Sequence, residues 1–334
     1  MKIIVPMAGR GTRLRPHTLT TPKPLVKIAG KPIVHRLVED LAAMSDEKIE
    51  EVAFVIGDFG EVVEKELLDI ASALGAEGKI YYQEDPLGTA HAIHCAKESL
   101  EGNVIVAFAD TLFKADFTID KLQDGIIWTQ KVEDPSAFGV VKVNEQGVIT
   151  DFIEKPQTFV TDLAIIGIYY FREGEVLRNE LQYLIDNKIM NSGEYQLTAA
   201  LENMKQNGTN FKPGTVQHWL DCGNKDALVD TNQNYLNFIK DQDLISDSAE
   251  LSNTVLISPV YIGANVKITN SVIGPHVSVG DNTEISHSVV TNSIIQEDAK
   301  ITHVNIENSV VGNKVEYFGR SKDLSIGDFT KVKE

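Results

Sequence analysis

The chain has 334 residues, 43% of them hydrophobic and 24% charged, which is enough to bury a substantial core and to form two domains. Its net charge of −17 argues against broad binding to nucleic acid or to an anionic membrane. Cys95 and Cys222, the two cysteines, stand far apart and offer neither a disulfide framework nor metal-ligand spacing. No stretch reaches the length of a signal-peptide core or a membrane span, so we expect a cytoplasmic protein.

The first 110 residues alternate apolar strands with helices. We expect strands at Ile3–Met7, Val52–Ile56, Lys79–Gln83 and Val104–Ala109, and helices at Pro32–Met44, Glu61–Leu74 and Thr89–Leu100. Strands without polar alternation, separated by helices, predict a parallel sheet covered on both faces. Such sheets bind ligands at the carboxyl ends of their strands. The loop after the first strand, Gln83 and Asp110 are therefore candidate site residues.

Residues 126–239 continue the same α/β pattern. We expect strands at Ile126–Lys131, Gly139–Val143, Val148–Ile153, Ala164–Phe171 and Gly214–Asp221, and helices near 175–187, 195–206 and 225–239. The polar segment Lys240–Glu250 then predicts a domain boundary, so that residues 1–240 and 251–334 form two domains.

The pattern changes after residue 250, where aliphatic residues recur in steps of five or six. They stand at positions 256, 262, 268, 273, 279, 285, 290, 295, 301, 306 and 311. Three steps add to about 16–17 residues, a period that no α-helix gives and that is typical of a β-solenoid. The segments "IGANVKI", "VGDNTEI" and "QEDAKI" resemble the hexapeptide repeat of left-handed parallel β-helices. Just under four turns fit between Leu251 and Val315.

The loop after the first strand, "PMAGRGTRLRPHTLTTPKPL" (6–25), concentrates positive charge in an acidic protein. Its basic residues are Arg10, Arg13, Arg15 and Lys23. A dinucleotide-binding fingerprint fails because Leu14 replaces its third glycine, and a P-loop fails because Thr12 and Arg13 follow Gly11. A tight turn with solvent-facing arginines remains an alternative.

The segment "AGRGTRLRPHTLTTPKPL" resembles the signature of the sugar nucleotidylyltransferases, or sugar-1-phosphate pyrophosphorylases, with Ala8 in place of the first glycine. The resemblance implies that Ala8, Gly9, Gly11 and Thr12 bind the nucleotide, since glycine lets backbone N–H groups approach phosphate oxygens. It implies that Arg13 forks across the leaving pyrophosphate, while Lys23 brings a point charge to its other side. We expect no direct role in the reaction for Arg10 and Arg15, which would either steer anions toward the site or face solvent.

Four further segments match this family in the same order. "QEDPLGTAHAI" (83–93) resembles its base-reading segment and implies that Gln83, Gly88 and Thr89 bind the nucleotide, with Gly88 leaving room for the base. "VIVAFAD" (104–110) and "HWLDCG" (218–223) imply that Asp110 and Asp221 bind Mg²⁺. Taken singly, either aspartate could instead cap a turn.

The sugar end is implied by "DPSAFGVV" (134–141) and "IEKP" (153–156). There Gly139 would lie against the sugar, Glu154 would bind its hydroxyls, and Lys155 would bind its phosphate and act in catalysis. Many family members carry a polar residue where this chain has Ile165 and Ile166, which leaves the identity of the sugar open.

The resemblance implies a Rossmann-like, doubly wound mixed sheet followed by a left-handed parallel β-helix. The implied reaction is Mg²⁺-dependent transfer of a nucleotidyl group from a nucleoside triphosphate to a hexose-1-phosphate, with release of pyrophosphate. The attacking phosphate is largely ionised at neutral pH, so no general base is required. The amide of Gln83 favours dTTP or UTP, with glucose-1-phosphate as acceptor; GTP with mannose-1-phosphate is the alternative.

The β-helix leaves two roles open. It could join copies of the chain into a homo-oligomer, or it could carry an acetyltransferase activity with His276, His287 or His303 as base. A further alternative is a non-catalytic nucleotide-sugar sensor. That reading is disfavoured because such a sensor would have lost some of the charged site residues, all of which are present: Arg13, Lys23, Asp110, Lys155 and Asp221.

Overall fold

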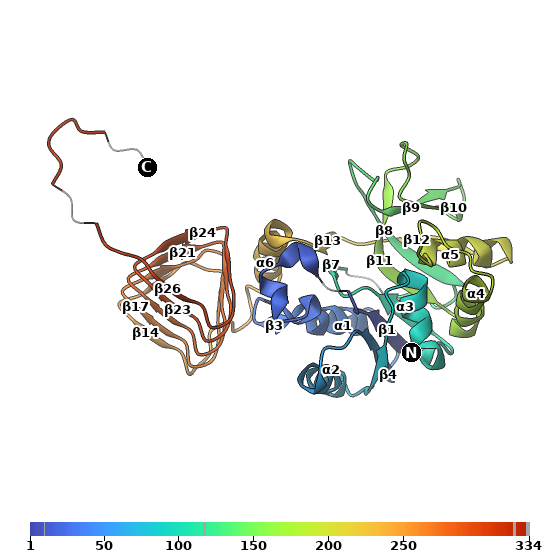
Figure 1. The fold of residues 1–334 in the computed structure, drawn as a ribbon, viewed down its shortest axis with the longest axis horizontal. Coiled ribbons are helices and arrows are strands. Elements are labelled where there is room, and N and C mark those ends of the chain that lie inside the picture. The colour runs from blue at the N-terminus through green and yellow to red at the C-terminus, as the bar shows by residue number, and fades with distance from the viewer. Residues whose placement is uncertain (10, 116–117, 323–324, 332–334) are drawn as a thin grey trace. The chain divides into compact units, whose positions relative to one another are not determined.

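A computed structural model of the protein describes residues 1–9, 11–115, 118–322 and 325–331 (Figure 1). The chain forms two compact units. The N-terminal unit comprises Met1–Val26 and Lys31–Asn224, and the C-terminal unit comprises Lys27–Gly30 and Lys225–Glu334. The domain limits 1–240 and 251–334 stay a prediction. Within the described residues, no helix combines the length and apolarity that a bilayer crossing demands.

A nine-stranded mixed sheet forms the centre of the N-terminal unit. Four strands, β1 (Lys2–Pro6), β4 (Glu51–Ile56), β5 (Glu77–Tyr82) and β6 (Val104–Ala107), pair in parallel in the order β6-β1-β4-β5. The remaining strands are β8 (Gly125–Lys131), β9 (Gly139–Val143), β10 (Ile149–Glu154), β11 (Leu163–Phe171) and β12 (Phe211–Thr215). Because β11 runs antiparallel to β6, the sheet is mixed, and the predicted fold class is confirmed.

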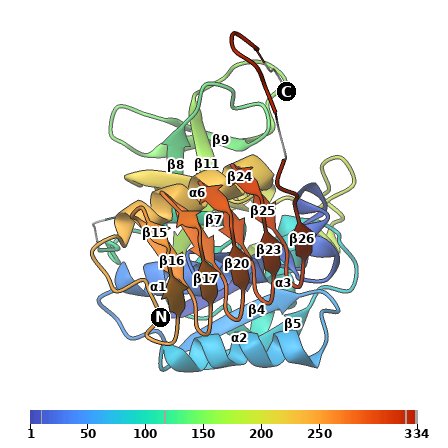
Figure 2. The same ribbon diagram turned by 90° about the vertical axis from the view of Figure 1, so that its left-hand side faces the viewer.

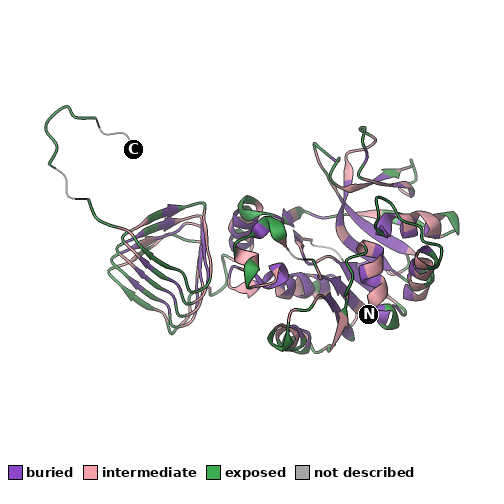
Figure 3. Ribbon diagram, viewed as in Figure 1, coloured by how far each residue is buried: buried purple, intermediate pink, exposed green. Residues whose placement is uncertain are grey.

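Helices bury the faces of this sheet. They are α1 (Ile33–Ala43), α2 (Glu61–Ala73), α3 (Thr89–Cys95), α4 (Gly174–Asp186) and α5 (Leu197–Gln206). In α1 the apolar residues Ile33, Leu37 and Leu41 follow helical spacing and are fully buried. At the centre of the sheet, β4 and β6 are buried along their whole length, and β1 is buried from its second residue onward (Figure 3).

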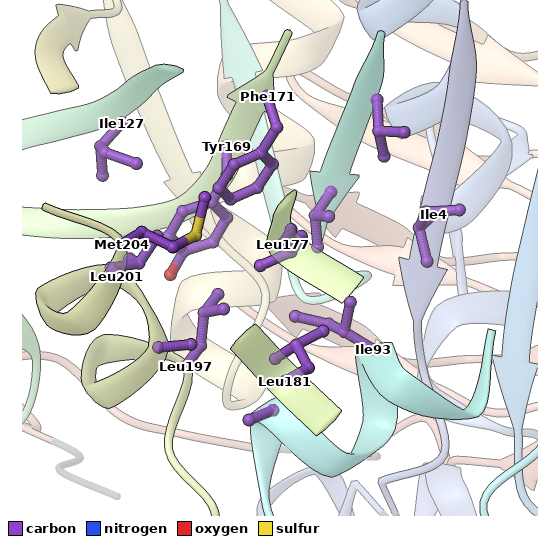
Figure 4. Close-up of a cluster of buried hydrophobic side chains, with 14 of the residues drawn as sticks. Ile4, Ile93, Ile127, Tyr169, Phe171, Leu177, Leu181, Leu197, Leu201 and Met204 are labelled. Atoms are coloured by element: carbon purple, nitrogen blue, oxygen red, sulfur yellow. The ribbon is translucent and has the colours of Figure 1, made fainter. Parts of the chain in front are cut away.

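One large apolar cluster joins this sheet to three of the helices. Ile4 of β1, Ile93 of α3, Leu181 of α4 and Leu201 of α5 converge on it, together with Tyr169 of β11 (Figure 4). Burying each aliphatic side chain of this kind contributes about 1.5–3 kcal/mol to folding. The cluster therefore fixes the loops at the strand ends on a rigid base.

Two local predictions were wrong. The single strand expected at Gly214–Asp221 is two strands, because the chain leaves β12 beside β8 and starts β13 (His218–Asp221) beside β7 (Thr111–Lys114). β7 was not predicted, and together β7 and β13 form a separate two-stranded antiparallel sheet. The helix expected at Thr89–Leu100 ends at Cys95 and is followed by a 3-10 turn over Lys97–Ser99.

The C-terminal unit is built from three parallel sheets whose strands repeat every turn (Figure 2). In one sheet the paired positions are Glu250, Lys267, Glu284, Lys300 and Glu316, so successive turns are 17, 17, 16 and 16 residues apart. The aliphatic residues picked out by their spacing form its interior, with Ile268, Ile285 and Ile301 in register and almost fully buried. This confirms the parallel β-helix; its left-handed sense stays a prediction.

The strands of the β-helix are two or three residues long. They are β14 (Glu250–Ser252), β15 (Val255–Leu256), β16 (Val260–Ile262), β17 (Lys267–Thr269), β18 (Val272–Ile273), β19 (Val277–Val279), β20 (Glu284–Ser286), β21 (Val289–Thr291), β22 (Ile294–Ile295), β23 (Lys300–Thr302), β24 (Asn305–Glu307), β25 (Val310–Val311) and β26 (Glu316–Phe318). One corner of the coil is a ladder of left-handed residues at Asn253, Asn270, His287 and His303. The rings of His287 and His303 stack with centroids 4.7 Å apart.

The C-terminal unit also contains α6 (Lys225–Phe238) and a segment from far earlier in the chain, Lys27–Gly30. Asn232 of α6 is fully buried. Its Oδ1 accepts hydrogen bonds from the backbone N–H of Ala29 (3.0 Å) and from the hydroxyl of Ser278 (2.7 Å). A Cβ added to Gly30 would lie 2.1 Å from the ring of Tyr261, so only glycine fits at this position.

Candidate active site

Two cavities adjoin in the N-terminal unit at the carboxyl ends of β1, β5 and β6. They measure about 390 and 340 Å³ and share the lining residues Arg13, Thr89, Phe108 and Asp110. We call the two together the cleft, the larger one the first cavity and the smaller one the second cavity. Ligand binding at this edge of the sheet is what the order of strands and helices predicted.

The loop after β1 forms one wall of the first cavity. Ala8, Gly9, Gly11, Thr12 and Arg13 line it, as does Lys23. Gly11 has φ +57°, and a Cβ there would lie 2.8 Å from Cβ of Lys23, so both the turn and the close approach require glycine. A Cβ on Gly9 would meet nothing within 4 Å. Arg10 lies outside the described residues.

Positive and negative charge meet on the floor of the cleft. The ammonium of Lys23 lies 3.3 Å from Oδ2 of Asp110. The exposed guanidinium of Arg13 lines both cavities and forms no ion pair with any residue in the described part of the chain. The cleft therefore presents one cation already held by an acid and one that is available to an anionic ligand.

The far wall of the first cavity is made by the loop after β5. The amide nitrogen of Gln83 lies 3.2 Å from the carbonyl oxygen of Gly88 and 3.1 Å from Nδ1 of His91. Gly88 has φ +112°, and a Cβ there would lie 2.5 Å from the carbonyl oxygen of Tyr195. The glycine is thus required by neighbouring backbone, a reason that differs from the predicted one of making room for a base.

Thr89 and the start of α5 are joined by hydrogen bonds. The backbone N–H of Leu197 donates to the Thr89 hydroxyl (2.9 Å), which donates to Oε1 of Gln196 (3.3 Å). Gln196 and Thr198 line the second cavity. No sequence pattern predicted these two residues, because they lie at the start of a helix more than 100 positions after Thr89.

Asp110 and Asp221 are brought together by the small sheet of β7 and β13. Asp110 directly precedes β7 and Asp221 ends β13, and the backbone N–H of Cys222 donates to the carbonyl oxygen of Asp110 (3.1 Å). Both aspartates line the second cavity. Oδ1 of Asp221 also accepts the backbone N–H of Gly223 at 2.9 Å, so this carboxylate shapes the local turn as well.

The second cavity carries the other predicted residues. Oε2 of Glu154 accepts the hydroxyl of Thr198 (3.0 Å), and a Cβ on Gly139 would lie 3.2 Å from the same oxygen. Ile165 and Ile166 form an apolar part of the wall. Burial, with the nearby charges of Glu154 and Asp110, raises the pKa of Tyr169, so its phenol stays protonated at neutral pH.

Lys155 is the exception among the predicted site residues. It lies next to Glu154 at the end of β10 with φ +41°, its side chain is 58% exposed, and it lines neither cavity. Its ammonium lies 3.8 Å from Oε1 of Glu154. All the other predicted residues line the cleft. Phe108, Glu194 and Trp219 line it too, although no role was predicted for them.

The family model for nucleotidyl transferases matches residues 2–237. The chain belongs to the nucleotidyl transferase family. It is 31% identical over 265 residues to the low-salt glycan biosynthesis nucleotidyltransferase of Haloferax volcanii, covering 76% of this chain and 72% of that one. It is 30% identical over 362 residues, covering 99% of each chain, to the glucose-1-phosphate thymidylyltransferase of Streptomyces antibioticus.

Other relatives of this nucleotidyl transferase are named for other substrates. It is 38% identical over 192 residues to the mannose-1-phosphate guanylyltransferase catalytic subunit beta of Drosophila pseudoobscura pseudoobscura, covering 54% of this chain and 50% of that one. The protein is therefore a sugar-nucleotide nucleotidyltransferase whose base and sugar are not fixed by its relatives.

A solved structure confirms the fold of this nucleotidyl transferase. The nucleoside-diphosphate-sugar pyrophosphorylase of Vibrio cholerae RC9 superposes with a TM-score of 0.60 at 19% identity, covering 69% of this chain and 99% of that one.

Nucleotidyl transferases of this family generally use a divalent metal ion. Among the described residues, no cluster of three or more His, Cys, Asp or Glu side chains could hold a metal by itself. Asp110 and Asp221 nevertheless fit an ion that takes one or two carboxylates and completes its shell with water and substrate phosphates, as Mg²⁺ does.

Proposed function

We propose that the enzyme transfers a thymidylyl or uridylyl group from dTTP or UTP to glucose-1-phosphate, with Mg²⁺ as cofactor. One observation carries the proposal: the cleft brings the basic loop after β1, the amide of Gln83, two aspartates and Glu154 to the edges of two adjoining cavities. This order of groups suits a base, a triphosphate, a metal ion and a sugar in succession.

In this proposal the first cavity holds the nucleoside triphosphate. Gln83 and Gly88 meet the base, and Ala8, Gly9, Gly11, Thr12 and Thr89 surround the ribose and phosphates. Arg13 binds the β- and γ-phosphates bidentately, and Lys23 neutralises charge on their other side. Both cations then stabilise the charge that develops on pyrophosphate as it leaves.

The second cavity holds the sugar phosphate. Glu154, fixed by Thr198, accepts hydrogen bonds from sugar hydroxyls, while Gly139 lets the ring approach. Lys155 binds the sugar phosphate after turning from its exposed position. A phosphate oxygen of the sugar phosphate forms a bond to the α-phosphorus, and the bond from that phosphorus to the bridging oxygen breaks, giving pyrophosphate its electron pair.

Asp110 and Asp221 would hold the metal ion between the two substrates. When bound there, the ion supplies positive charge that offsets the repulsion between two phosphate groups. No side chain has to remove a proton from the nucleophile, since the sugar phosphate is largely ionised at neutral pH.

The relative from Streptomyces antibioticus supports thymidylyl transfer to glucose-1-phosphate, because it is similar along the whole chain. GTP with mannose-1-phosphate is the second candidate. It is favoured by the guanylyltransferase relative, while the apolar Ile165 and Ile166 in the second cavity leave the identity of the sugar open.

The test is pyrophosphate release from ATP, GTP, CTP, UTP and dTTP, each with glucose-1-phosphate, mannose-1-phosphate and N-acetylglucosamine-1-phosphate. We expect dTTP or UTP with glucose-1-phosphate to be turned over fastest and Asp110→Ala to be inactive. Release from no pair, or full activity of Asp110→Ala, would refute the assignment.

We also propose that the β-helix joins copies of the chain into a homo-oligomer. Light scattering on the purified protein tests this, and a monomer at micromolar concentration would contradict it.

A further inference from the structure

The amide of Gln83 has used both of its donor hydrogens within the protein. Its nitrogen lies 3.2 Å from the carbonyl oxygen of Gly88 and 3.1 Å from Nδ1 of His91. A side-chain amide has two N–H donors and one carbonyl acceptor. With both donors engaged, the acceptor Oε1 is the polar atom that Gln83 can offer to a ligand in the first cavity.

The arrangement requires Nδ1 of His91 to act as an acceptor, which a protonated imidazole cannot do. The ring is half-buried in α3, and this burial lowers the pKa of His91, against the opposing charge of Asp85. The backbone of Asp85 also opposes this lowering, but burial has the larger effect. At neutral pH the imidazole is therefore neutral, with one nitrogen free of hydrogen to receive the amide.

We propose that His91 is a positioning residue that holds the amide of Gln83 with Oε1 toward the nucleobase. The proposal rests on the proposed function, in which Gln83 meets the base. If the amide turned over, Oε1 would face the carbonyl oxygen of Gly88, a repulsive contact, and it would also face the lone pair of His91 unless the imidazole moved its hydrogen to Nδ1. When His91 is lost, the carbonyl oxygen of Gly88 is the one contact within the described part of the chain that still opposes rotation of the amide.

This orientation selects a class of base. Uracil and thymine carry a ring N–H at N3, and guanine carries one at N1, so each can donate to Oε1. Cytosine at N3 and adenine at N1 present a lone pair instead, which Oε1 repels, and their neighbouring amino groups can donate to Oε1 only after the base shifts within the cavity. The site therefore favours bases with a ring N–H beside a carbonyl over cytosine and adenine.

The experiment compares kcat/KM for UTP with that for CTP, and for GTP with that for ATP, using the acceptor sugar found by the pyrophosphate screen. His91→Leu removes the acceptor. His91→Gln supplies another acceptor, its own Oε1, at similar reach. His94→Leu is the matched control, because His94 lies on the same helix and hydrogen-bonds Gln182 (2.8 Å) without lining the cleft.

We expect the wild-type enzyme to favour UTP over CTP and GTP over ATP. In His91→Leu these ratios fall about tenfold or more, the discrimination that one buried hydrogen bond supports. They stay close to the wild-type values in His91→Gln and in His94→Leu. Ratios are used because a general loss of activity cancels from them.

Calorimetric binding of UDP and CDP provides a second readout that needs no turnover. Equal use of UTP and CTP by the wild type, or an unchanged ratio in His91→Leu, would overturn the role of His91 while leaving the transferase activity established. Absence of turnover with every triphosphate would refute the proposed function instead, and the UDP-to-CDP binding ratio would still decide on His91.

Discussion

The ammonium of Lys23 lies 3.3 Å from Oδ2 of Asp110, and the lysine side chain is nearly buried whereas the carboxylate is half exposed. This pair joins the loop after β1 to the loop after β6 across the floor of the cleft. Lys23 is thus fixed in place before any ligand arrives, and the exposed side of Asp110 remains open. A cation held in this way is suited to stabilising phosphate charge without reorganising.

Replacing Lys23 by Met removes the charge and keeps most of the side-chain volume. We expect kcat/KM for pyrophosphate release to fall about 10³-fold, as when other transition-state cations of phosphoryl transfer are lost. Lys31→Met is the control, because Lys31 pairs with Glu39 (2.7 Å) and does not line the cleft. Activity within twofold of wild type in Lys23→Met would exclude a role for this lysine in catalysis.

Removal of divalent ions with EDTA should abolish pyrophosphate release, and added Mg²⁺ should restore it. Asp221→Asn should raise the Mg²⁺ concentration that gives half-maximal rate, since one charged oxygen ligand is lost. Asp226→Asn, at an exposed aspartate outside the cleft, should leave that concentration unchanged. Full activity in EDTA would show that the two aspartates serve only the local turns.

Gly88→Ala should destabilise the protein more than Gly75→Ala does. Both glycines have positive φ, but a Cβ on Gly88 would lie 2.5 Å from a backbone oxygen, while one on Gly75 would meet nothing within 4 Å. We expect Gly75→Ala to lower the free energy of unfolding by about 1 kcal/mol through backbone strain alone. Urea unfolding measures the free energy of unfolding of both variants. Equal losses in Gly88→Ala and Gly75→Ala would show that the contact with Tyr195 is easily relieved.

The interior of the β-helix should be sensitive to a cavity at Ile285. This side chain is 1% exposed and lies in register between Ile268 and Ile301, so Ile285→Ala should cost about 2–5 kcal/mol. Val289→Ala, at a half-exposed valine on the neighbouring sheet, should cost about 0.5 kcal/mol or less. Hydrogen exchange over residues 250–318 reports the local loss of protection. Similar exchange in both variants would contradict tight packing of this core.

Partly buried histidines should make the protein less stable as the pH falls below 6.5. Burial lowers the pKa of His17, His35, His91, His94 and His276 from the ordinary value of 6.5. The unfolded chain then binds protons that the folded chain does not, so acidification from pH 7.5 to 5.5 favours unfolding. We expect the urea midpoint to fall over this range, and less so in His94→Gln. A midpoint that rises on acidification would contradict this sign.

Strand periodicity predicted most of the sheet and, through the strand ends, Gln83 and Asp110. Strand periodicity missed β7, because a strand of four residues is too short to show a pattern of alternating or continuous apolar residues. Lys155 was expected in the cleft, but its side chain is exposed and its backbone is left-handed, a conformation that no side-chain pattern predicts. Thr198 reaches Glu154 from a helix 44 positions away, a contact that only the folded chain reveals.

The segment Lys27–Gly30 has a practical consequence for dividing the protein. A fragment of residues 1–224 would retain this segment but not Asn232, Tyr261 or Gln296, which bind or cover it. Ile28 and Ala29, both buried in the whole protein, would then be exposed to water only five and six residues after Lys23. A single cut in the chain therefore cannot release the catalytic half intact, and a shortened enzyme would need a redesigned connection between Val26 and Lys31.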